Sequence, residues 1–198
     1  RAPIVISGGG VHVSAASAAL AALQQDAHLP VATTTMGKGA VDETHPLSIG
    51  VVGSFMGPYA ASRHQRSLVT DADVVLLVGN RTNQNGTDSW TLYPSGAQYI
   101  HIDIDGAEVG RNYEALRLVG DARETLQALR KELLGGDLSV RTAARGALVE
   151  RIKTGRQRYE DESLSLRQSD ARPIRLERIM EEIAAQMSDE TIVVADAS

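Results

Sequence analysis

Short continuous runs of apolar residues alternate along this chain with segments that have the apolar spacing of helices. The clearest runs are "PIVISG" at 3–8, "LPVATT" at 29–34 and "ADVVLLVG" at 72–79. Runs of this length, rich in β-branched residues, are typical of strands covered on both faces of a sheet. Two more strands are predicted at 98–105 ("QYIHIDID") and 116–121 ("LRLVGD").

Helical spacing fills the segments between these strands. A helix is predicted over 13–27, with Ser14 as its N-cap. A long glycine-rich loop is expected to contain "MGKG" and "THPLSIGVVG". A second helix is expected from about 59 to 69, where Pro58 suits a first-turn position.

The segment 121–136, "DARETLQALRKELLGG", carries the strongest helix signals in the chain. Asp121 and Glu124 have the spacing of a capping box, and Gly135 and Gly136 end the helix. Strands and helices therefore alternate throughout. That alternation predicts an α/β fold with a doubly wound parallel sheet, helices on both faces and right-handed crossovers.

The composition changes after residue 137, which suggests three parts. Residues 1–137 form the predicted α/β domain, and 138–172 form a charged surface helix and linker. Residues 173–198 start a second α/β domain, with a helix followed by a buried strand in "TIVVADAS" at 191–198. We expect the chain to be a segment of a longer protein.

Composition excludes several classes of protein. The chain has no cysteine, which excludes a thiol nucleophile, an iron–sulfur cluster and a thiolate zinc site within it. The formal charge of -5 is spread along the sequence, so no basic surface for nucleic acid is expected. No apolar run approaches the ~20 residues of a membrane-spanning helix, and residues 1–30 lack the pattern of a signal peptide. We expect a soluble, cytoplasmic protein without membrane or nucleic-acid partners.

The glycine loop in "VISGGGVHVSAAS" matches half of a dinucleotide fingerprint. Gly8 and Gly10 occupy the first two glycine positions, but Val13 occupies the third, and the second strand ends in "ATTT" instead of an acid. Standard NAD binding is therefore disfavoured. Two alternatives stay open, namely a backbone that contacts phosphate and a tight turn between strand and helix.

Two further polar groups follow predicted strands. In "HIDID" the side chains of His101, Asp103 and Asp105 share one side of a strand, where they could bind a divalent metal, accept hydrogen bonds from ribose hydroxyls or remain solvated. Arg81 follows the strand at 72–79 and could pair with a phosphate or with a neighbouring carboxylate. For Trp90 the alternatives are packing within its loop, which we expect, and a stacking platform for a ligand.

Four stretches together resemble one known family. They are "ISGGGVHVSAA", "LPVATTTMGKGAVDETHPLSIGVVG", "DADVVLLVGNR" and "QYIHIDIDGAEVGRNYEALRLVGDARETLQAL". In this order they are similar to the central domain of thiamine-diphosphate-dependent enzymes, closest to the acetolactate synthase large-subunit type. The tail from residue 172 resembles the start of the diphosphate-binding domain of that family. The resemblance implies a six-stranded, Rossmann-like sheet that does not carry out the chemistry itself.

The resemblance also implies a nucleotide site in this domain, filled by FAD in acetolactate synthases and by an adenine nucleotide in oxalyl-CoA decarboxylases. The residues that it places around the nucleotide are Gly8, Gly9, Gly10, Thr34, Thr35, Gly53, Ser54, Gly79, Arg81, Asp103, Ile104, Gly120 and Asp121. Residues 81–85 read "RTNQN", where FAD-binding members have a pattern such as R-F-D-D-R. An ADP- or coenzyme A-binding module is therefore the alternative.

For the parent protein, the resemblance implies a carboligase or decarboxylase that acts on a 2-oxo acid. Thiamine diphosphate and Mg²⁺ would bind to domains outside this chain, and other domains of the same polypeptide would be its partners in a homo-oligomer. The chain alone is expected to be catalytically inert, with no catalytic or metal-binding residue of its own.

Overall fold

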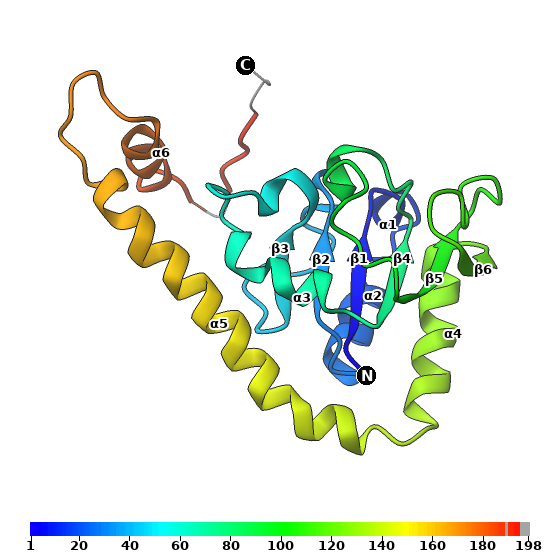
Figure 1. The fold of residues 1–198 in the computed structure, drawn as a ribbon. Coiled ribbons are helices and arrows are strands. Elements are labelled where there is room, and N and C mark those ends of the chain that lie inside the picture. Colours follow the sequence, from blue (N-terminus) through cyan, green and yellow to red (C-terminus); the bar gives the residue numbers. More distant parts are fainter. Residues whose placement is uncertain (189, 195–198) are drawn as a thin grey trace. The chain divides into compact units, whose positions relative to one another are not determined.

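A parallel sheet forms the centre of the computed structural model, which describes residues 1–188 and 190–194 (Figure 1). Its six strands follow the order β3-β2-β1-β4-β5-β6, and every neighbouring pair is parallel. The strands are β1 (Pro3–Ser7), β2 (Val31–Thr33), β3 (Ser48–Val51), β4 (Val74–Val78), β5 (Gln98–Asp103) and β6 (Ala115–Val119). The direction of winding reverses between β1 and β4, which is the order of a Rossmann-like, doubly wound sheet. The predicted fold class is confirmed.

Six α-helices accompany the sheet in the described part of the chain. They are α1 (Gly10–Val13), α2 (Ser17–Asp26), α3 (Arg66–Thr70), α4 (Ala122–Leu134), α5 (Ser139–Arg167) and α6 (Leu176–Ala184). Short 3-10 turns lie at η1 (Thr35–Gly37), η2 (Gly53–Met56), η3 (Arg63–Gln65) and η4 (Asn85–Thr87). None of the described helices is long and apolar enough to cross a membrane. The chain divides into two compact units, residues 1–156 and 157–198, and the sheet belongs to the first.

Each face of the sheet is buried under its own apolar core. On one face, Val5 and Val78 pack with Leu20 and Leu23 of α2 and with Leu126 of α4. On the other face, the neighbouring strand residues pack with helices α3 and α5; this second core includes Ile4, Ile6, Leu77, Val69 and Ile152. Because side chains alternate along a strand, the continuous apolar runs in the sequence supply both cores at once.

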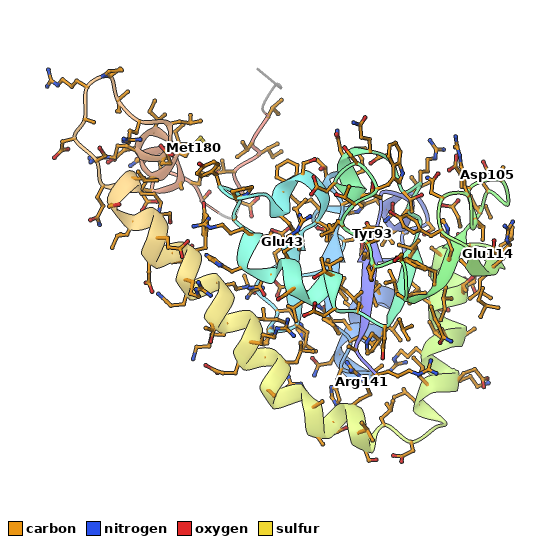
Figure 2. All side chains as sticks on the ribbon, viewed as in Figure 1. Glu43, Tyr93, Asp105, Glu114, Arg141 and Met180 are labelled. Atoms are coloured by element: carbon orange, nitrogen blue, oxygen red, sulfur yellow. The ribbon has the colours of Figure 1, made fainter. Side chains whose placement is uncertain are left out.

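The first part of α5 is fixed to the sheet domain by polar contacts as well as by Ile152. The buried amide of Gln65 donates from Nε2 to the carbonyl of Ile152 at 2.8 Å. Arg156 donates to the carbonyls of Ser48 at 2.6 Å and Glu43 at 2.9 Å, and Glu43 is labelled in Figure 2. The spacing of apolar residues at 140–152 predicted a surface helix; the helix extends to Arg167 and includes most of the polar stretch that follows.

Helix α4 forms where its sequence signals place it. The Asp121 carboxylate accepts a hydrogen bond from the backbone amide of Glu124 at 3.2 Å, and Gly135 is the C-cap. Leu126 is fully buried, and Leu129 and Leu133 pack against the same core, so one apolar stripe of the helix faces the sheet. These local signals are sufficient for the helix because its cap and its apolar stripe agree.

Two sequence predictions in the first half of the chain are wrong. The expected loop contains strand β3, whose four residues include Gly50 at φ +97°, and a glycine inside a strand weakens the sequence signal for it. The expected helix at 59–69 is reduced to η3 and α3. Pro58 instead lies in a turn closed by the Ala60 amide on the carbonyl of Gly57 at 3.1 Å, a position that proline favours.

Ser14 is not the N-cap of a helix. It follows α1 as the C-cap, and its hydroxyl donates to the carbonyl of Gly10 at 3.0 Å. Ala15 then takes a left-handed conformation at φ +50°, which separates α1 from α2. The helical segment therefore begins at the glycine loop itself, and Ala16 precedes α2 without a side-chain cap.

The second unit contains the end of α5, a loop and α6. Arg167 pairs with Glu160 and, at 3.0 Å, with Glu181 of α6. Ile179 and Ile183 of α6 and Met187 beyond it line one partly exposed apolar surface.

The buried strand predicted at 191–198 is not formed at 191–194. Ile192 is 88% exposed, and no described strand in this unit is available to pair with it. The remaining positions, 195–198, lie outside the described residues.

Substitution of the two glycines of α5 by alanine tests the Gln65 contact. A Cβ at Gly155 would lie 2.5 Å from the Gln65 Nε2, whereas a Cβ at Gly146 meets nothing within 4 Å. We expect G146A to stabilise the fold by up to about 1 kcal/mol through helix propensity. G155A displaces the buried amide from Ile152, so it should be less stable than G146A by about 1–3 kcal/mol in urea unfolding. Equal stabilities of the two variants would contradict this contact.

His101 predicts a pH dependence of stability. Burial lowers its pKa below the ordinary value of 6.5, and its Nδ1 accepts the Gly110 amide at 3.1 Å, which requires that nitrogen to be unprotonated. The unfolded chain takes up this proton first, so stability is complete above about pH 6.5 and is lost as the pH falls towards the lower folded pKa.

The variant H101N keeps an acceptor for Gly110 but cannot titrate. Urea unfolding at a series of pH values should therefore give a shallower loss of stability on acidification for H101N than for the parent chain. His45 also has a pKa lowered mainly by burial, and its contribution stays in both proteins. Parallel curves for the two proteins would show that His101 is not the source of the slope.

Candidate functional site

The residues that the sequence suggested for a nucleotide site all follow, or end, strands of one parallel sheet. Gly8, Gly9 and Gly10 follow β1; Thr34 and Thr35 follow β2; Gly53 and Ser54 follow β3; Gly79 and Arg81 follow β4; Asp103 ends β5 and Ile104 follows it; Gly120 and Asp121 follow β6. The carboxyl ends of parallel strands meet at the same edge. In α/β sheets this edge, at the point where the winding reverses, is where ligands bind.

The glycine loop after β1 packs directly against the loop after β4. A Cβ at Gly8 would lie 2.2 Å from the carbonyl oxygen of Gly79, and one at Gly10 would lie 2.6 Å from the Gly79 Cα. Gly79 itself has φ +54°. Gly8 and Gly10 are therefore required by the contact between the two loops, which favours the tight-turn interpretation for them. Gly9 is more open, since a Cβ added there would lie 3.2 Å from the Cβ of Met36.

A second close contact joins the loops after β3 and β4. Gly53 has φ +79°, and its Cβ would lie 1.9 Å from the carbonyl oxygen of Asn85. The Ser54 hydroxyl donates to that same carbonyl at 3.3 Å. Gly86 in turn lies against the side chain of Thr34, whose Cγ2 would be 3.3 Å from a Cβ added at Gly86. Backbone packing thus brings the ends of β2, β3 and β4 together.

Two of the suggested residues have structural roles in capping. Thr34 is buried, and its Oγ1 accepts the Gly37 amide at 3.2 Å at the start of η1. Asp121 caps α4, as described above. Thr35, in contrast, is exposed on η1. Capping leaves Thr34 and Asp121 fewer free polar atoms for a ligand than Thr35.

The end of β5 presents a carboxylate to solvent. One oxygen of Asp103 accepts the amide of Asp105 at 3.0 Å, while the second oxygen makes no hydrogen bond to a described residue. Ile104 is 73% exposed beside it. The amide of Gly120 donates to the carbonyl of Asp103 at 2.9 Å, so the ends of β5 and β6 are also joined.

The structure does not favour a metal for His101, Asp103 and Asp105, because these side chains do not form a group that could hold one. Among residues 1–188 and 190–194, no group of three histidine, aspartate or glutamate side chains has the arrangement of a metal site. His101 is 1% exposed, and its Nδ1 is occupied by the Gly110 amide. Asp105 lies beyond the end of β5, where its oxygen accepts the amide of Ala107 at 2.9 Å (Figure 2). Alternation along a strand therefore did not predict where the chain leaves the strand.

Arg81 differs from the other polar groups at this edge. It is exposed and makes no hydrogen bond or ion pair with a described residue. Arg66 and Arg111, by comparison, pair with Asp88 and Glu108 at 2.9 Å and 3.2 Å. An unpaired guanidinium and a free carboxylate oxygen are the groups that contact the phosphate and the hydroxyls of a nucleotide.

Asparagine side chains shape this edge, and two of them, Asn80 and Asn112, were not singled out from the sequence. Asn80 accepts the Thr82 amide through Oδ1 at 2.9 Å, and Asn83 accepts the Gly86 amide in the same way. Asn112 donates to the carbonyl of Thr82 at 3.1 Å from the loop after β5. The frequency of asparagine in "GNRTNQNGT" was the available signal, because asparagine side chains favour turns of this kind.

Comparison with known proteins shows which family the chain is similar to. Residues 1–129 match the family model for the central domain of thiamine pyrophosphate enzymes. A protein of Methanocaldococcus jannaschii that is described as an acetolactate synthase large subunit is 34% identical over 190 residues, which is 94% of this chain and 30% of the relative. A glyoxylate carboligase of Escherichia coli O157:H7 is 37% identical over 131 residues, 64% of this chain and 21% of the relative.

A solved structure shares the fold. It is that of a protein from Mycobacterium smegmatis, described as a thiamin diphosphate-dependent enzyme, with a TM-score of 0.51 and 21% identity over 65% of this chain and 24% of the other. The chain thus spans less than a third of the length of each of these proteins. Since the family model matches residues 1–129 and the sheet has the order and parallel pairing described above, the chain belongs to the thiamine pyrophosphate enzyme central-domain family.

Proposed function

We propose that this chain is the central, non-catalytic part of a thiamine-diphosphate-dependent carboligase or decarboxylase that acts on a 2-oxo acid. The observation that carries the proposal is the family match over residues 1–129. It is supported by relatives named as acetolactate synthase and glyoxylate carboligase. Within this proposal, residues 1–137 are the central domain, 138–172 the connection and 173–198 the start of the diphosphate-binding domain.

Thiamine diphosphate supplies such an enzyme with a carbanion that attacks the carbonyl of the 2-oxo acid and then accepts its electrons. In the proposed parent, the cofactor and its Mg²⁺ bind to other domains of the polypeptide, in a cytoplasmic homo-oligomer. The role of this chain is to hold a nucleotide and to connect those domains. We expect the 198-residue chain alone to leave 2-oxo acids unchanged.

The residues at the carboxyl edge fit a ligand with an adenosine diphosphate group. The free oxygen of Asp103 is available to ribose hydroxyls, and the unpaired Arg81 is available to phosphate. Gly9 and Thr35 present backbone and hydroxyl groups on the neighbouring loops. FAD, ADP and coenzyme A share this adenosine diphosphate group, so all three are candidates.

A second candidate function is an ADP- or coenzyme A-binding module without flavin. The loop after β4 supports it, because Asn83 uses its side-chain oxygen to close the turn at Gly86 at 2.9 Å. The Asn83 oxygen is therefore engaged within its own loop, which leaves the Nδ2 group as the part of this side chain that is unengaged by the described residues. The relative affinities for FAD, ADP and coenzyme A separate the two candidates.

Ligand binding to the purified chain tests the nucleotide site. At concentrations near one hundred times Kd, FAD, ADP or coenzyme A should raise Tm by roughly 5–10 °C, because binding to the folded state alone stabilises it. NAD should give a smaller shift than the ligand that fills the site. A yellow purified protein would identify retained FAD, and no shift with any of the three ligands would contradict the nucleotide site.

The variant D103N tests the ribose contact. Asparagine keeps an oxygen for the Asp105 amide but removes the charge, so ADP should bind about tenfold more weakly in isothermal titration calorimetry. D137N is the matched control, since Asp137 also accepts a backbone amide, that of Ser139 at 2.8 Å, before α5. Equal losses of affinity in both variants would argue against a contact with Asp103.

The activity of the parent is tested with the complete enzyme. Consumption of pyruvate or glyoxylate that requires added thiamine diphosphate and Mg²⁺ would support a carboligase or decarboxylase. Consumption of neither would contradict the proposed reaction.

A further inference from the structure

The loop between β4 and β5 concentrates backbone strain in this molecule. Thr82, Asp88, Ser89 and Trp90 have φ of +49°, +51°, +54° and +61°, and three of them are consecutive. A non-glycine residue in this left-handed conformation is destabilised because its Cβ lies too close to the following carbonyl oxygen, less so for aspartate. Such residues persist only where the surrounding structure fixes them, and they concentrate at functional sites.

Several hydrogen bonds hold the loop at its first strained residue. Thr82 is 2% exposed, and its amide donates to Asn80 Oδ1 at 2.9 Å. Asn112, from the loop after β5, donates to the hydroxyl of Thr82 at 2.8 Å and to its carbonyl at 3.1 Å. Contacts from two separate loops therefore determine the conformation of Thr82.

The second strained segment is held from both ends. Asp88 pairs with Arg66 at 2.9 Å, at the start of α3. The Ser89 amide donates to the carbonyl of Gln84 at 2.8 Å, and the Trp90 amide donates to Thr87 Oγ1 at 3.0 Å. Contacts within the protein thus suffice to position the backbone that carries Trp90.

This arrangement fixes the Trp90 indole without burying it. Its Nε1 donates to the carbonyl of Thr82 at 3.0 Å, yet the residue is 51% exposed. Packing within the loop, as predicted, is thus found only for the indole nitrogen, which bonds to Thr82. About half of the residue remains accessible to solvent. The residue before Thr82 is Arg81, the exposed guanidinium without a partner among the described residues. A fixed aromatic surface and a free cation therefore originate on one rigid loop.

We propose that Trp90 is a stacking surface for the planar heteroaromatic ring of the ligand whose phosphate is assigned to Arg81 in the nucleotide site proposed above. The proposal rests on that site and adds the ring contact to it. Stacking of a base on an aromatic side chain strengthens binding about ten- to a hundredfold, and a guanidinium can hold a phosphate with two hydrogen bonds. Adenine and flavin are the two rings that such a ligand could carry.

Trp90 is the single tryptophan of the chain, so its fluorescence reports this site alone. We expect saturating ADP or FMN to change the Trp90 emission and to reduce its quenching by acrylamide in the 198-residue chain. ADP tests adenine, and FMN tests flavin without adenine. Unchanged accessibility of Trp90 in chain saturated with the ligand would overturn the proposal without any variant.

Variants separate the ring contact from the phosphate contact. W90L should weaken binding of ADP or FMN about ten- to a hundredfold in calorimetry, W90F by less, and neither should change the affinity for inorganic pyrophosphate. R81Q should weaken ADP and pyrophosphate about tenfold, and leave adenosine unchanged. Matched controls are Y59L, an aromatic that is 95% exposed, and R151Q, whose arginine pairs with Asp71; both should bind as the parent chain does.

The outcomes distinguish this proposal from the proposed function. If ADP, FAD or coenzyme A binds with the same affinity to the parent chain, W90L and R81Q, the nucleotide site stands and the assignment of these two residues is wrong. If the parent chain binds none of ADP, FMN, FAD and coenzyme A, both proposals are wrong. Circular dichroism of each variant confirms folding, and the acrylamide measurement decides for Trp90 if W90L does not fold.

Discussion

The contact between the backbones of Gly8, Gly10 and Gly79 is the constraint on which the carboxyl edge depends. No side chain fits at Gly8 or Gly10, because the loop after β4 occupies that space. The contact lies at the reversal of winding between β1 and β4. A side chain at Gly8 or Gly10 would push the two loops apart. Because both positions are glycine, the loops touch and form one continuous surface.

The remaining loops are fixed relative to this pair. Gly53 and Ser54 join the end of β3 to Asn85, and Asn112 joins the loop after β5 to Thr82. The loop after β4 is therefore held by neighbours on both sides, and this explains how it keeps several non-glycine residues in left-handed conformations. A site built on such a loop needs little rearrangement to bind, which lowers the entropic cost of association.

Local patterns predicted part of this fold and tertiary contacts determined the rest. Helix α4 was predicted because Asp121, Glu124 and Leu126 carry its cap and its buried stripe in one short segment. Strand β3 was missed because Gly50 takes a positive φ and only pairing with β2 makes the segment a strand. The strand predicted at 191–198 is not formed at 191–194 for the opposite reason. Its apolar composition favours a strand, but no described strand pairs with it.

The position of the candidate site could be predicted better than its details. Parallel strands end at one edge of the sheet, so the residues that follow them lie at that edge whatever their side chains contact. The sequence could not show that Thr34 and Asp121 are engaged in caps, or that Asp105 lies beyond the strand. It also could not show that Trp90 is exposed while its indole nitrogen is bonded to Thr82. That contact depends on four residues of the loop with left-handed backbone.

The edge of the sheet at β6 has a consequence for solubility. β6 pairs only with β5 among the described strands, and Leu116 and Val119 on it are 63% and 60% exposed. An apolar strand with an open edge is a template on which strands of other molecules can add, and this is how aggregation begins. Arg117 lies between these two residues, with its guanidinium against Gly110 and 3.7 Å from Glu114. A charge in the middle of an edge strand opposes the addition of another strand, and Arg117 occupies that position in β6.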